Sequence, residues 1–398
     1  MAHKEKKPQL TILLFLFSFS NVLGMMYVAS LPSLTTFFGI EKGIAQQTIA
    51  LFLVGYALGQ LIYGPLSSAL GRKVAIYIGC CLALIGSLIC VLAIEIQSFS
   101  LLLIGRLVTA LGSASGLSMT FTMISDVFTH AEAKKKISLL IGAFALFPAV
   151  GIFIGGLLTE YISWKSCFYF MLIYCVFILV LSFFLPETLK EKDSSHLHPL
   201  RVLKTYFSHF RHLVFLFCSL ILGISGGIIY IFAAEAPYIA INQLGTSPDL
   251  FGLLNLIPFF GLFVGGFFSS FISSKLSPKR LILLGTLIYF VSSLIMLASF
   301  QLNYVNVNTL FFIPLAIFFS FPLIYSSSSL LGISISPHKS YAASLINFIM
   351  LMIAVLIMES LFLFPSPEAV ILPAIYSCIG VILIFLWIVL RLLPTEEN

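Results

Sequence analysis

The chain has 398 residues, of which 60% are hydrophobic and 9% are charged, and its formal net charge is +6. A soluble domain carries about 25% charged residues, so a chain this apolar cannot cover its own surface in water. Composition therefore excludes an ordinary soluble enzyme, a disordered protein, a collagen and a secreted disulfide scaffold. The 40 Phe and 27 Gly fit a helical membrane protein, where Gly is commoner than in soluble helices.

Twelve long apolar runs predict twelve membrane-spanning helices. A hydrocarbon core of about 30 Å requires roughly 20 apolar residues per helix, whereas barrel strands would show about ten alternating residues. The first run is too long for a cleaved signal peptide, so we expect it to be retained as the first helix. The runs are 10–32, 49–66, 74–94, 101–123, 137–158, 168–185, 214–234, 251–272, 281–300, 310–331, 342–364 and 371–390.

The basic residues predict the orientation of these spans. With both termini in the cytoplasm, almost every Lys and Arg outside the spans falls in a cytoplasmic segment, and only Lys42 and Lys165 fall in outer loops. This distribution follows the positive-inside rule. The basic residues then act as topological anchors of a protein whose partner is the lipid bilayer. This role explains the net positive charge, so we expect no nucleic acid partner.

Residues that carry chemistry are not arranged for catalysis or metal binding. The seven Cys lie in or beside apolar runs without a CxxC pair and are interpreted as packing residues. All seven His fall in predicted cytoplasmic segments, so no span offers a His as a metal ligand, proton relay or base. Without an aspartate pair or a nucleotide-binding P-loop, we expect no enzyme, no metal, no cofactor and no direct use of ATP.

The chain contains an internal repeat. Residues 51–73 align with 257–279, each copy with a pair of glycines one turn apart, and residues 27–32 align with 232–237. Parallel repeats with a site at their interface are typical of transporters. We therefore predict an all-α membrane protein of twelve transmembrane helices in two pseudo-symmetric six-helix bundles. The predicted parts are an N-terminal bundle (1–186), a cytoplasmic linker (187–212), for which a regulatory or lipid-headgroup role is the alternative, and a C-terminal bundle (213–398).

Several motifs resemble one transporter family. The loop after the second run reads Gly64-Pro65-Leu66-Ser67-Ser68-Ala69-Leu70-Gly71-Arg72-Lys73, and the other motifs are Gly105-Arg106, Phe147-Pro148-Ala149-Val150-Gly151, Gly155-Gly156, Trp164-Lys165, Pro186-Glu187-Thr188, Pro337-His338 and Ala342-Ala343-Ser344-Leu345. Together they resemble the bicyclomycin/chloramphenicol-resistance (Bcr/CflA) drug-efflux branch of the major facilitator superfamily.

The resemblance implies a bacterial inner-membrane antiporter that exchanges cytoplasmic small molecules for protons by alternating access. Two departures from the family pattern matter. Ser68 stands where the loop motif usually has an acid, and Met25 aligns with an Asp that the family usually carries in its first helix. Since an embedded carboxylate is the obvious proton carrier, a coupling acid would have to lie elsewhere.

Three charged residues at or inside the spans are candidates for coupling: Arg106, Glu235 and Glu359. An Arg inside a span usually faces a cavity or a partner, although Arg106 is near enough to the outer interface to extend its head group into water instead. Desolvation makes proton binding by an embedded carboxylate possible near neutral pH. Glu235 lies just before Pro237, where a broken helix would turn it to the cavity; solvated helix-end acids are the alternative for both Glu235 and Glu359.

A cytoplasmic gate is predicted from the loop motif. Arg72 and Lys73 follow Gly64 and Gly71, and the topology brings Arg72 near Asp126 at the end of the fourth span. An exposed pair of this kind is worth less than about 1 kcal/mol, but a switch needs only a modest bias between two states. The alternative is that Asp126 is an ordinary interfacial charge.

The fifth span carries the element that, by resemblance, is characteristic of antiporters. Pro148, Gly151 and Gly155 lie on one face of the helix, and Gly156 follows. Small residues permit close helix approach and Pro permits bending, so we interpret the element as a hinge or seal in export, with plain tight packing as the alternative.

A mostly apolar cavity with a few polar groups would suit a small-molecule substrate. The candidates to line it are Tyr27, Tyr56, Tyr230, Asn255 and Asn347, each of which can equally serve in core packing.

The leading hypothesis is secondary active, proton-coupled export of small amphipathic drugs or toxic metabolites by a monomer. Within transport, the alternative is movement of one specific metabolite, siderophore or nutrient, because substrates differ widely on one fold. A non-transporting membrane sensor is the alternative from another class.

Overall fold

The computed structural model of the protein describes residues 7–129, 146–189, 212–335, 339–363 and 369–393, together with positions 132, 136, 140, 206 and 209. Nearly all of these residues are helical, because a segment in lipid must satisfy its backbone polar groups internally. The N-terminal half consists of α1 (Leu10–Met25), η1 (Val28–Ser30), α2 (Leu31–Phe38), α3 (Lys42–Leu70), α4 (Arg72–Glu95), α5 (Phe99–Val127), α7 (Leu146–Tyr161) and α8 (Ser166–Phe183).

The C-terminal half continues the helical pattern. It consists of α10 (Leu213–Pro237), the π-helical turn η3 (Tyr238–Gln243), α11 (Pro248–Leu254), α12 (Leu256–Ile272), α13 (Pro278–Gln301), α14 (Val307–Ser334), α15 (Lys339–Glu359), η4 (Ser360–Leu363) and α16 (Ile371–Leu392).

The expected membrane spans are present. Eleven helical stretches of the described chain are long and apolar enough to cross a membrane, and α7 is a shorter apolar helix. Apart from position 140, residues 137–145, with which the fifth predicted run begins, lie outside the described residues. The predicted all-helical membrane fold is confirmed, and the protein is a multi-pass membrane protein. Most of the predicted linker 187–212 also lies outside the described residues.

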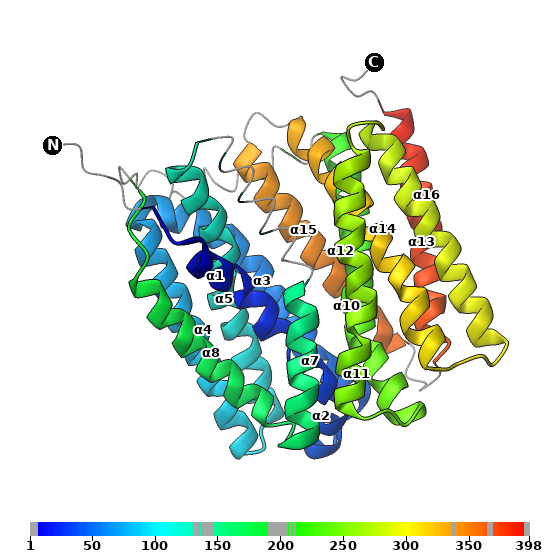
Figure 1. Ribbon diagram of the computed structural model, residues 1–398, viewed down its shortest axis with the longest axis horizontal. Coiled ribbons are helices and arrows are strands. Elements are labelled where there is room, and N and C mark those ends of the chain that lie inside the picture. Colours follow the sequence, from blue (N-terminus) through cyan, green and yellow to red (C-terminus); the bar gives the residue numbers. More distant parts are fainter. Residues whose placement is uncertain are drawn as a thin grey trace.

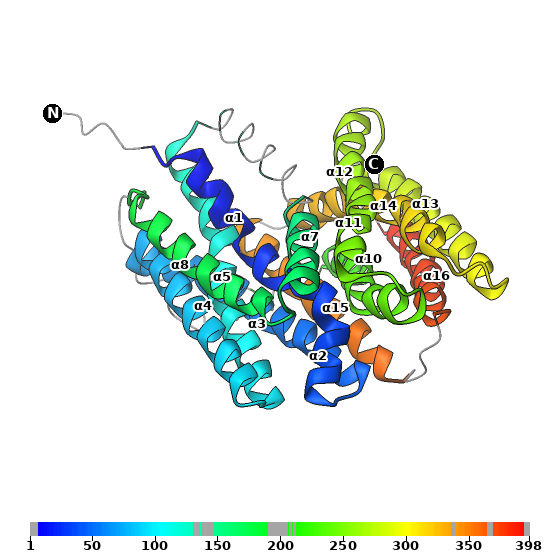
Figure 2. The same cartoon turned by 60° about the horizontal axis from the view of Figure 1, so that its bottom comes forward.

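The two halves stand side by side (Figure 1). The helix α1 begins and α16 ends at one end of the molecule, which we call the terminal end; α2 and α11 lie at the opposite or far end. The halves meet along two seams. On one side α7 packs against α11 and α12, and on the other α3 packs against α15 (Figure 2).

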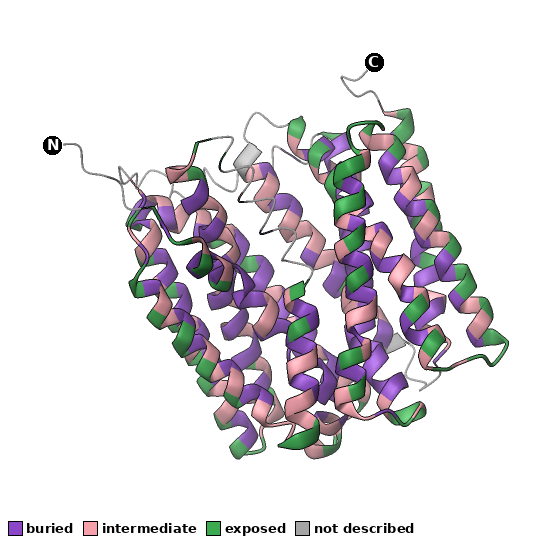
Figure 3. Ribbon diagram, viewed as in Figure 1, coloured by how far each residue is buried: buried purple, intermediate pink, exposed green. Residues whose placement is uncertain are grey.

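Burial follows the distribution expected for a protein in lipid. Buried residues line the helix faces that meet one another, and exposed residues follow the outward-facing sides (Figure 3). Large apolar side chains are exposed on these outer faces, among them Leu92, Ile173, Phe271, Leu356 and Phe385. Exposing this apolar surface to water would be unfavourable, whereas it is favourable in the hydrocarbon core of a bilayer.

The aligned glycines of the repeat perform the same packing role in each half. A Cβ atom on Gly55 would clash with the Leu107 carbonyl of α5, and one on Gly261 would clash with the Leu315 carbonyl of α14. The second glycine of each pair, four residues on, is equally close to the same partner helix. The repeat therefore preserves one close helix contact, α3 with α5 and α12 with α14.

Two spans are irregular near the far end. The first is interrupted after Met25, where α1 gives way to η1 and then to α2. In the seventh, α10 runs on through Glu235 to Pro237 and then gives way to the wider π-helical turn η3, so the helix is irregular after Pro237 and unbroken at Glu235. Proline lacks a backbone N–H and therefore cannot donate to the carbonyl four residues earlier, that of Ala233.

Candidate functional site

Arg106 is buried inside the N-terminal half. Only 1% of it is exposed, so the alternative in which its head group extends into water is wrong. Its Nη1 and Nη2 atoms donate to the carbonyls of Leu23 and Gly24 at 2.7 and 3.1 Å, and its Nε donates to the Thr48 carbonyl at 3.3 Å. The first two carbonyls belong to the last turn of α1, where a helix leaves its carbonyls without partners. Arg106 thus caps the interrupted first span.

Tyr27 belongs to this arrangement rather than to a cavity. Its ring lies 4.3 Å from the Arg106 guanidinium carbon, with Phe52 at 4.4 Å on the same cation. Its hydroxyl is 2.7 Å from that of Thr48, and its side chain is fully buried. The expectation that Tyr27 lines a substrate cavity is wrong in this conformation, because the ring is covered by the cation that it supports.

Glu235 connects the two halves at the far end. It lies on α10, is 2% exposed, and accepts from Lys42 Nζ of α3 at 2.6 Å. Its other carboxylate oxygen accepts from Gln46 Nε2 at 2.8 Å, and the same amide donates to the Ala234 carbonyl at 2.9 Å. A solvated helix-end acid is therefore the wrong interpretation of Glu235, since both of its oxygens are bound by the opposite half.

Further contacts join the halves around this ion pair. The Thr35 and Tyr238 hydroxyls are 2.7 Å apart, and the Lys42 ammonium lies 5.7 Å from the centre of the Tyr238 ring. The Tyr161 hydroxyl donates to Asp249 at 3.1 Å. In this conformation the far end is held closed by polar contacts between residues of opposite halves.

The proline and glycine element of the fifth span, which lies on α7, takes part in the same closure. A Cβ on Gly155 would clash with the Met26 carbonyl, within its own half, and a Cβ on Gly156 would clash with the Pro248 carbonyl, across the seam. Gly151 has only ordinary contacts, the nearest at 3.8 Å, and Pro148 is buried. Two of the four predicted residues are thus fixed by close backbone approach, and Gly156 is the one that faces the other half.

At the terminal end, Arg72 and Asp126 are in contact. Arg72 Nε donates to Asp126 at 3.0 Å, and Thr188 donates to the same carboxylate oxygen at 2.8 Å. The Arg72 side chain also reaches Ser67 and Ser68 at 3.1 and 3.3 Å. All of these residues belong to the N-terminal half or directly follow it, so the pair fastens helices of one half together, and its role in a gate remains a prediction.

Glu187 explains why glycine stands at position 71. Gly71 has a φ of +113°, and a Cβ there would lie 2.6 Å from a Glu187 carboxylate oxygen. The carboxylate accepts from the backbone N–H groups of Arg72 and Lys73 at 3.0 and 3.1 Å. Partial burial alone would raise the pKa of Glu187, but backbone N–H donors, beginning with that of Leu189, outweigh it and lower the pKa.

The remaining gate and coupling candidates differ from these. The Lys73 ammonium donates to the Phe183 carbonyl at 3.0 Å. Gly64 has open space where a Cβ would be, so packing does not require a glycine there. Glu359 ends α15 partly exposed, and in the described part of the chain it has no hydrogen bond or ion pair.

Polar groups of both halves lie close to one another. Tyr56 of α3 lies near Ser20 of α1 and Tyr325 of α14, and Tyr230 of α10 lies near both tyrosines. The Tyr325 hydroxyl donates to Asn347 Oδ1 of α15 at 3.3 Å. We call these five residues the central cluster. It contains three of the predicted cavity residues. A fourth, Asn255, is not part of the cluster: it lies at the junction of α11 and α12 and is 1% exposed.

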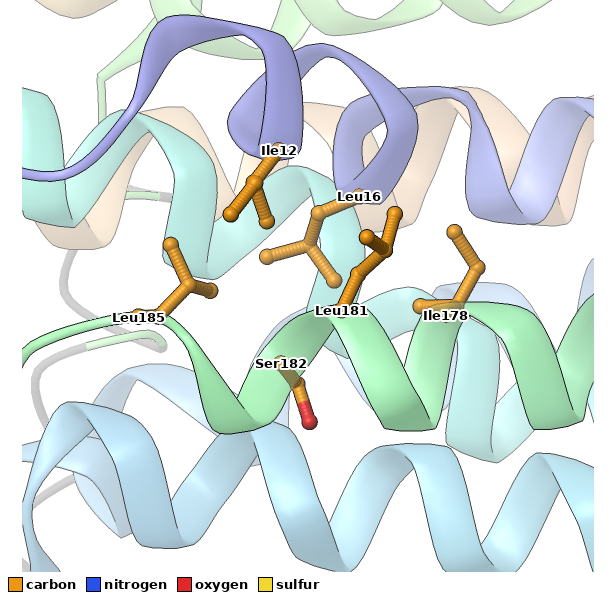
Figure 4. A pocket seen from close by; sticks show the side chains of 6 residues that line it. All are labelled: Ile12, Leu16, Ile178, Leu181, Ser182 and Leu185. Carbon is orange, nitrogen blue, oxygen red and sulfur yellow. The ribbon is translucent and has the colours of Figure 1, made fainter.

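Among the described residues, an enclosed hollow and an open groove lie outside the central cluster. One lies between α1 and α8, is too tight for a water molecule, and is lined by Ile12, Leu16, Ile178, Leu181, Ser182 and Leu185 (Figure 4). The other is an apolar groove of about 490 Å³ between α7 and the helices α12 and α14. Several of its wall residues, such as Phe260 and Phe312, are exposed on the outer surface. Neither hollow brings together polar groups that would recognise a solute.

Sequence reasoning did not identify Lys42, Gln46 or Tyr325. Lys42 was assigned to an outer loop, but it is the first residue of α3, and Gln46 follows one turn later. Their i, i+4 spacing places both side chains on one face. This was a usable signal, although it does not say which residue of the other half they meet. The described residues contain no group of three or more acidic, His or Cys side chains that would hold a metal ion.

Comparison with known proteins gives consistent relatives. A family model described as "Major Facilitator Superfamily" matches residues 10–358. An uncharacterized transporter of Rickettsia felis is 32% identical over 66% of this chain and 64% of its own length. A chloramphenicol resistance protein, CraA of Acinetobacter baumannii, is 26% identical over 71% of this chain and 68% of its own. A bicyclomycin resistance protein homolog of Haemophilus influenzae is 23% identical over 68% of this chain and 67% of its own.

The chain thus spans about two thirds of the length of these curated relatives, and they include both kinds of resistance protein that the motifs predicted. The fold is similar to a solved structure over a greater length. The xylose transporter XylE from E. coli, in a partially occluded inward open conformation, matches with a TM-score of 0.75 at 13% identity, covering 98% of each chain.

Proposed function

Because the chain belongs to the major facilitator superfamily, whose family model matches residues 10–358, we propose that it exports small amphipathic compounds in exchange for protons by alternating access. It does so as a monomer in a bacterial inner membrane, with both termini and the linker 187–212 in the cytoplasm. The bundles 1–186 and 213–398 move as the two units. Because both termini are cytoplasmic, the terminal end faces the cytoplasm and the far end faces outward.

The Glu235–Lys42 bridge is the observation that supports this proposal most strongly. A coupling acid must change its surroundings when the protein changes its conformation. Glu235 is buried and bound to Lys42 and Gln46 of the opposite half. Any movement that separates the halves at the far end removes both partners and admits water. Arg106, by contrast, keeps its partners because they lie within its own half.

The proposed coupling cycle uses the exchange of partners at Glu235. In the outward-open state Glu235 meets water and takes up a proton from outside. Closure returns the carboxyl to Lys42 and Gln46 of the opposite half and excludes the outside water. The proton then leaves toward the terminal end. Substrate binding from the cytoplasm then begins the next cycle.

Transport into sealed inside-out vesicles tests the proposal. The probes are ethidium and chloramphenicol, and wild type is compared with Glu235→Gln and with Glu359→Gln as the matched control. We expect accumulation of at least one probe that a protonophore abolishes, kept by Glu359→Gln and lost by Glu235→Gln. Protonophore-insensitive accumulation, or a Glu235→Gln variant that accumulates probe like wild type, contradicts the proposal.

A further inference from the structure

We infer that three basic residues at the terminal end of the C-terminal half bind the headgroup of an anionic phospholipid. They are Lys279 and Arg280 in the first turn of α13 and Arg391 in the last turn of α16, and we call them the C-terminal basic cluster. Lipid binding there goes beyond the proposed export function, because it does not depend on what the protein transports. Three features support it: the lack of acids beside the cluster, the contacts that hold it, and the apolar surface next to it.

Both copies of the internal repeat end in a basic pair, but only the first copy has acids beside it. In the N-terminal half Arg72 donates to Asp126 at 3.0 Å, and Glu187 accepts from both backbone N–H groups of the pair. The corresponding pair in the C-terminal half is Lys279 and Arg280. No member of the C-terminal basic cluster forms an ion pair with a described residue. Its charges are therefore available to an anion from outside the described chain.

The described carboxylates of the C-terminal half lie at the wrong end to neutralise this cluster. They belong to Glu235, Asp249 and Glu359. Glu235 and Asp249 make their contacts at the far end. Glu359 ends α15, and the chain continues from there to the start of α16, which runs back to the terminal end (Figure 1). The three positive charges thus have no described negative charge of their own half near them.

A tryptophan and two backbone carbonyls hold the cluster in place. Trp387 Nε1 donates to the Lys279 carbonyl at 2.8 Å, and Lys279 Nζ donates to the Leu393 carbonyl at 3.0 Å. The Arg391 guanidinium carbon lies 5.8 Å from the centre of the Trp387 ring. These contacts join the start of α13 to the end of α16, which pack side by side (Figure 1). Because the protein already positions the cations, a headgroup would bind without the cost of ordering them.

Apolar surface for acyl chains lies directly beside the cluster. Arg280 is exposed, and Leu287 and Val291, two and three turns along the same face of α13, are exposed as well. On α16 the exposed Ile388 lies one turn before the exposed Arg391. A guanidinium binds phosphate oxygens through its fork of N–H donors, and the cytoplasmic leaflet carries anionic lipids. A phospholipid satisfies both surfaces at once, whereas free phosphate would contact only the cations.

Quenching of tryptophan fluorescence by brominated lipids tests the inference in nanodiscs. The chain has two tryptophans, so Trp164→Phe leaves Trp387, within the proposed site, as the only fluorophore. Phosphatidylcholine discs receive increasing fractions of phosphatidylglycerol or of phosphatidylcholine brominated on the acyl chains. Since each basic residue near the surface is worth about fivefold, we expect brominated phosphatidylglycerol to half-quench Trp387 at a mole fraction about tenfold lower.

Two variants in this background distinguish a site from general attraction to a positive surface. Arg280→Gln/Arg391→Gln should bring the two lipids to within about twofold of each other, because it removes two of the three charges. Lys275→Gln is the matched control: its ammonium belongs to the loop after α12 and lies over the Phe271 ring at 4.7 Å, so the preference should persist. Equal quenching by both lipids in the parent, or an equal loss of preference in Lys275→Gln, overturns the inference.

Native mass spectrometry of the chain with both tryptophans provides a reading that does not depend on Trp164→Phe. The wild type should retain one phosphatidylglycerol that Arg280→Gln/Arg391→Gln loses, and equal retention by the two proteins would overturn the inference. Glu396 and Glu397 follow α16 in the sequence, outside the described residues. If phosphatidylglycerol is retained only by Glu396→Gln/Glu397→Gln, the chain's own acids occupy the cluster and the inference is wrong.

Discussion

Arg106 and Glu235 are both buried charges in the spans, yet they are held in opposite ways. Arg106 donates to three backbone carbonyls of its own half, so no rigid movement of the halves changes its surroundings. Glu235 is held by two side chains of the other half, so the same movement removes both of these hydrogen-bond partners. The comparison teaches that burial alone does not identify a coupling residue; what matters is whether its partners move relative to it.

The largest effect is expected at Arg106. Arg106→Met should reduce the free energy of unfolding by about 3–5 kcal/mol, because it leaves buried carbonyls without donors at about 1–3 kcal/mol each. Arg106→Lys should recover little, since a single ammonium cannot reproduce the planar fork of a guanidinium. Thermal unfolding in nanodiscs measures both. Variants as stable as wild type that have lost only transport would show that Arg106 is a coupling residue after all.

A smaller effect is expected at Lys42. Lys42→Met leaves Glu235 buried without its cation, and because Lys42 is partly exposed we expect a loss of about 2 kcal/mol, below the range for fully buried pairs. The double variant Lys42→Met/Glu235→Gln should recover most of that loss, since no uncompensated charge remains. Thermal unfolding of the four proteins forms a double-mutant cycle. Additive losses would mean that the two residues do not interact.

Glycine substitutions in α7 separate packing within a half from packing between halves. Gly156→Ala should oppose closure of the far end, because its Cβ clashes with the Pro248 carbonyl of the other half, whereas Gly151→Ala meets only ordinary contacts. Overpacking costs about 1–3 kcal/mol, enough to shift an equilibrium between two conformations. The rate of maleimide labelling at Gln46→Cys, applied from the far side, should rise with Gly156→Ala and stay unchanged with Gly151→Ala. Equal labelling in both would contradict the seam at Gly156.

The smallest effect is expected at the terminal end. The folded state lowers the pKa of Glu187, so its contribution to stability is present above the unfolded value of about 4.3. It is lost as pH falls through the lowered folded value. Melting temperatures of wild type and Glu187→Gln should therefore differ at pH 6 and converge in acid. A difference that grows on acidification would reverse the sign of the account.

Much of the fold was predictable because its signals are local. Apolar runs located the spans, and the repeat aligned two pairs of glycines, which the structure uses for the close contacts of α3 with α5 and of α12 with α14. The contact of Arg72 with Asp126 also followed from topology. In contrast, the meeting of Lys42 with Glu235 depends on how the two halves dock against each other, and no local pattern encodes that register.

Local patterns gave the wrong expectation where the same residues are compatible with two different structures. Pro237 suggested a broken helix beside Glu235, but α10 continues through Glu235 to Pro237 and the irregular turn η3 begins only after it. Tyr27 is of a residue type that often lines cavities, but the guanidinium of Arg106 covers its ring. The position of Tyr27 depends on Arg106, a residue distant in the sequence.

Proton movement driven by substrate tests the central claim most directly. Inside-out vesicles are acidified inside, chloramphenicol is added, and proton efflux is followed with a pH-sensitive dye, alongside exchange of labelled for unlabelled chloramphenicol without a gradient. We predict that wild type and Glu359→Gln release protons and exchange substrate, whereas Glu235→Gln exchanges substrate without moving protons. Substrate-driven proton efflux that persists in Glu235→Gln would show that another group carries the proton and would contradict the account.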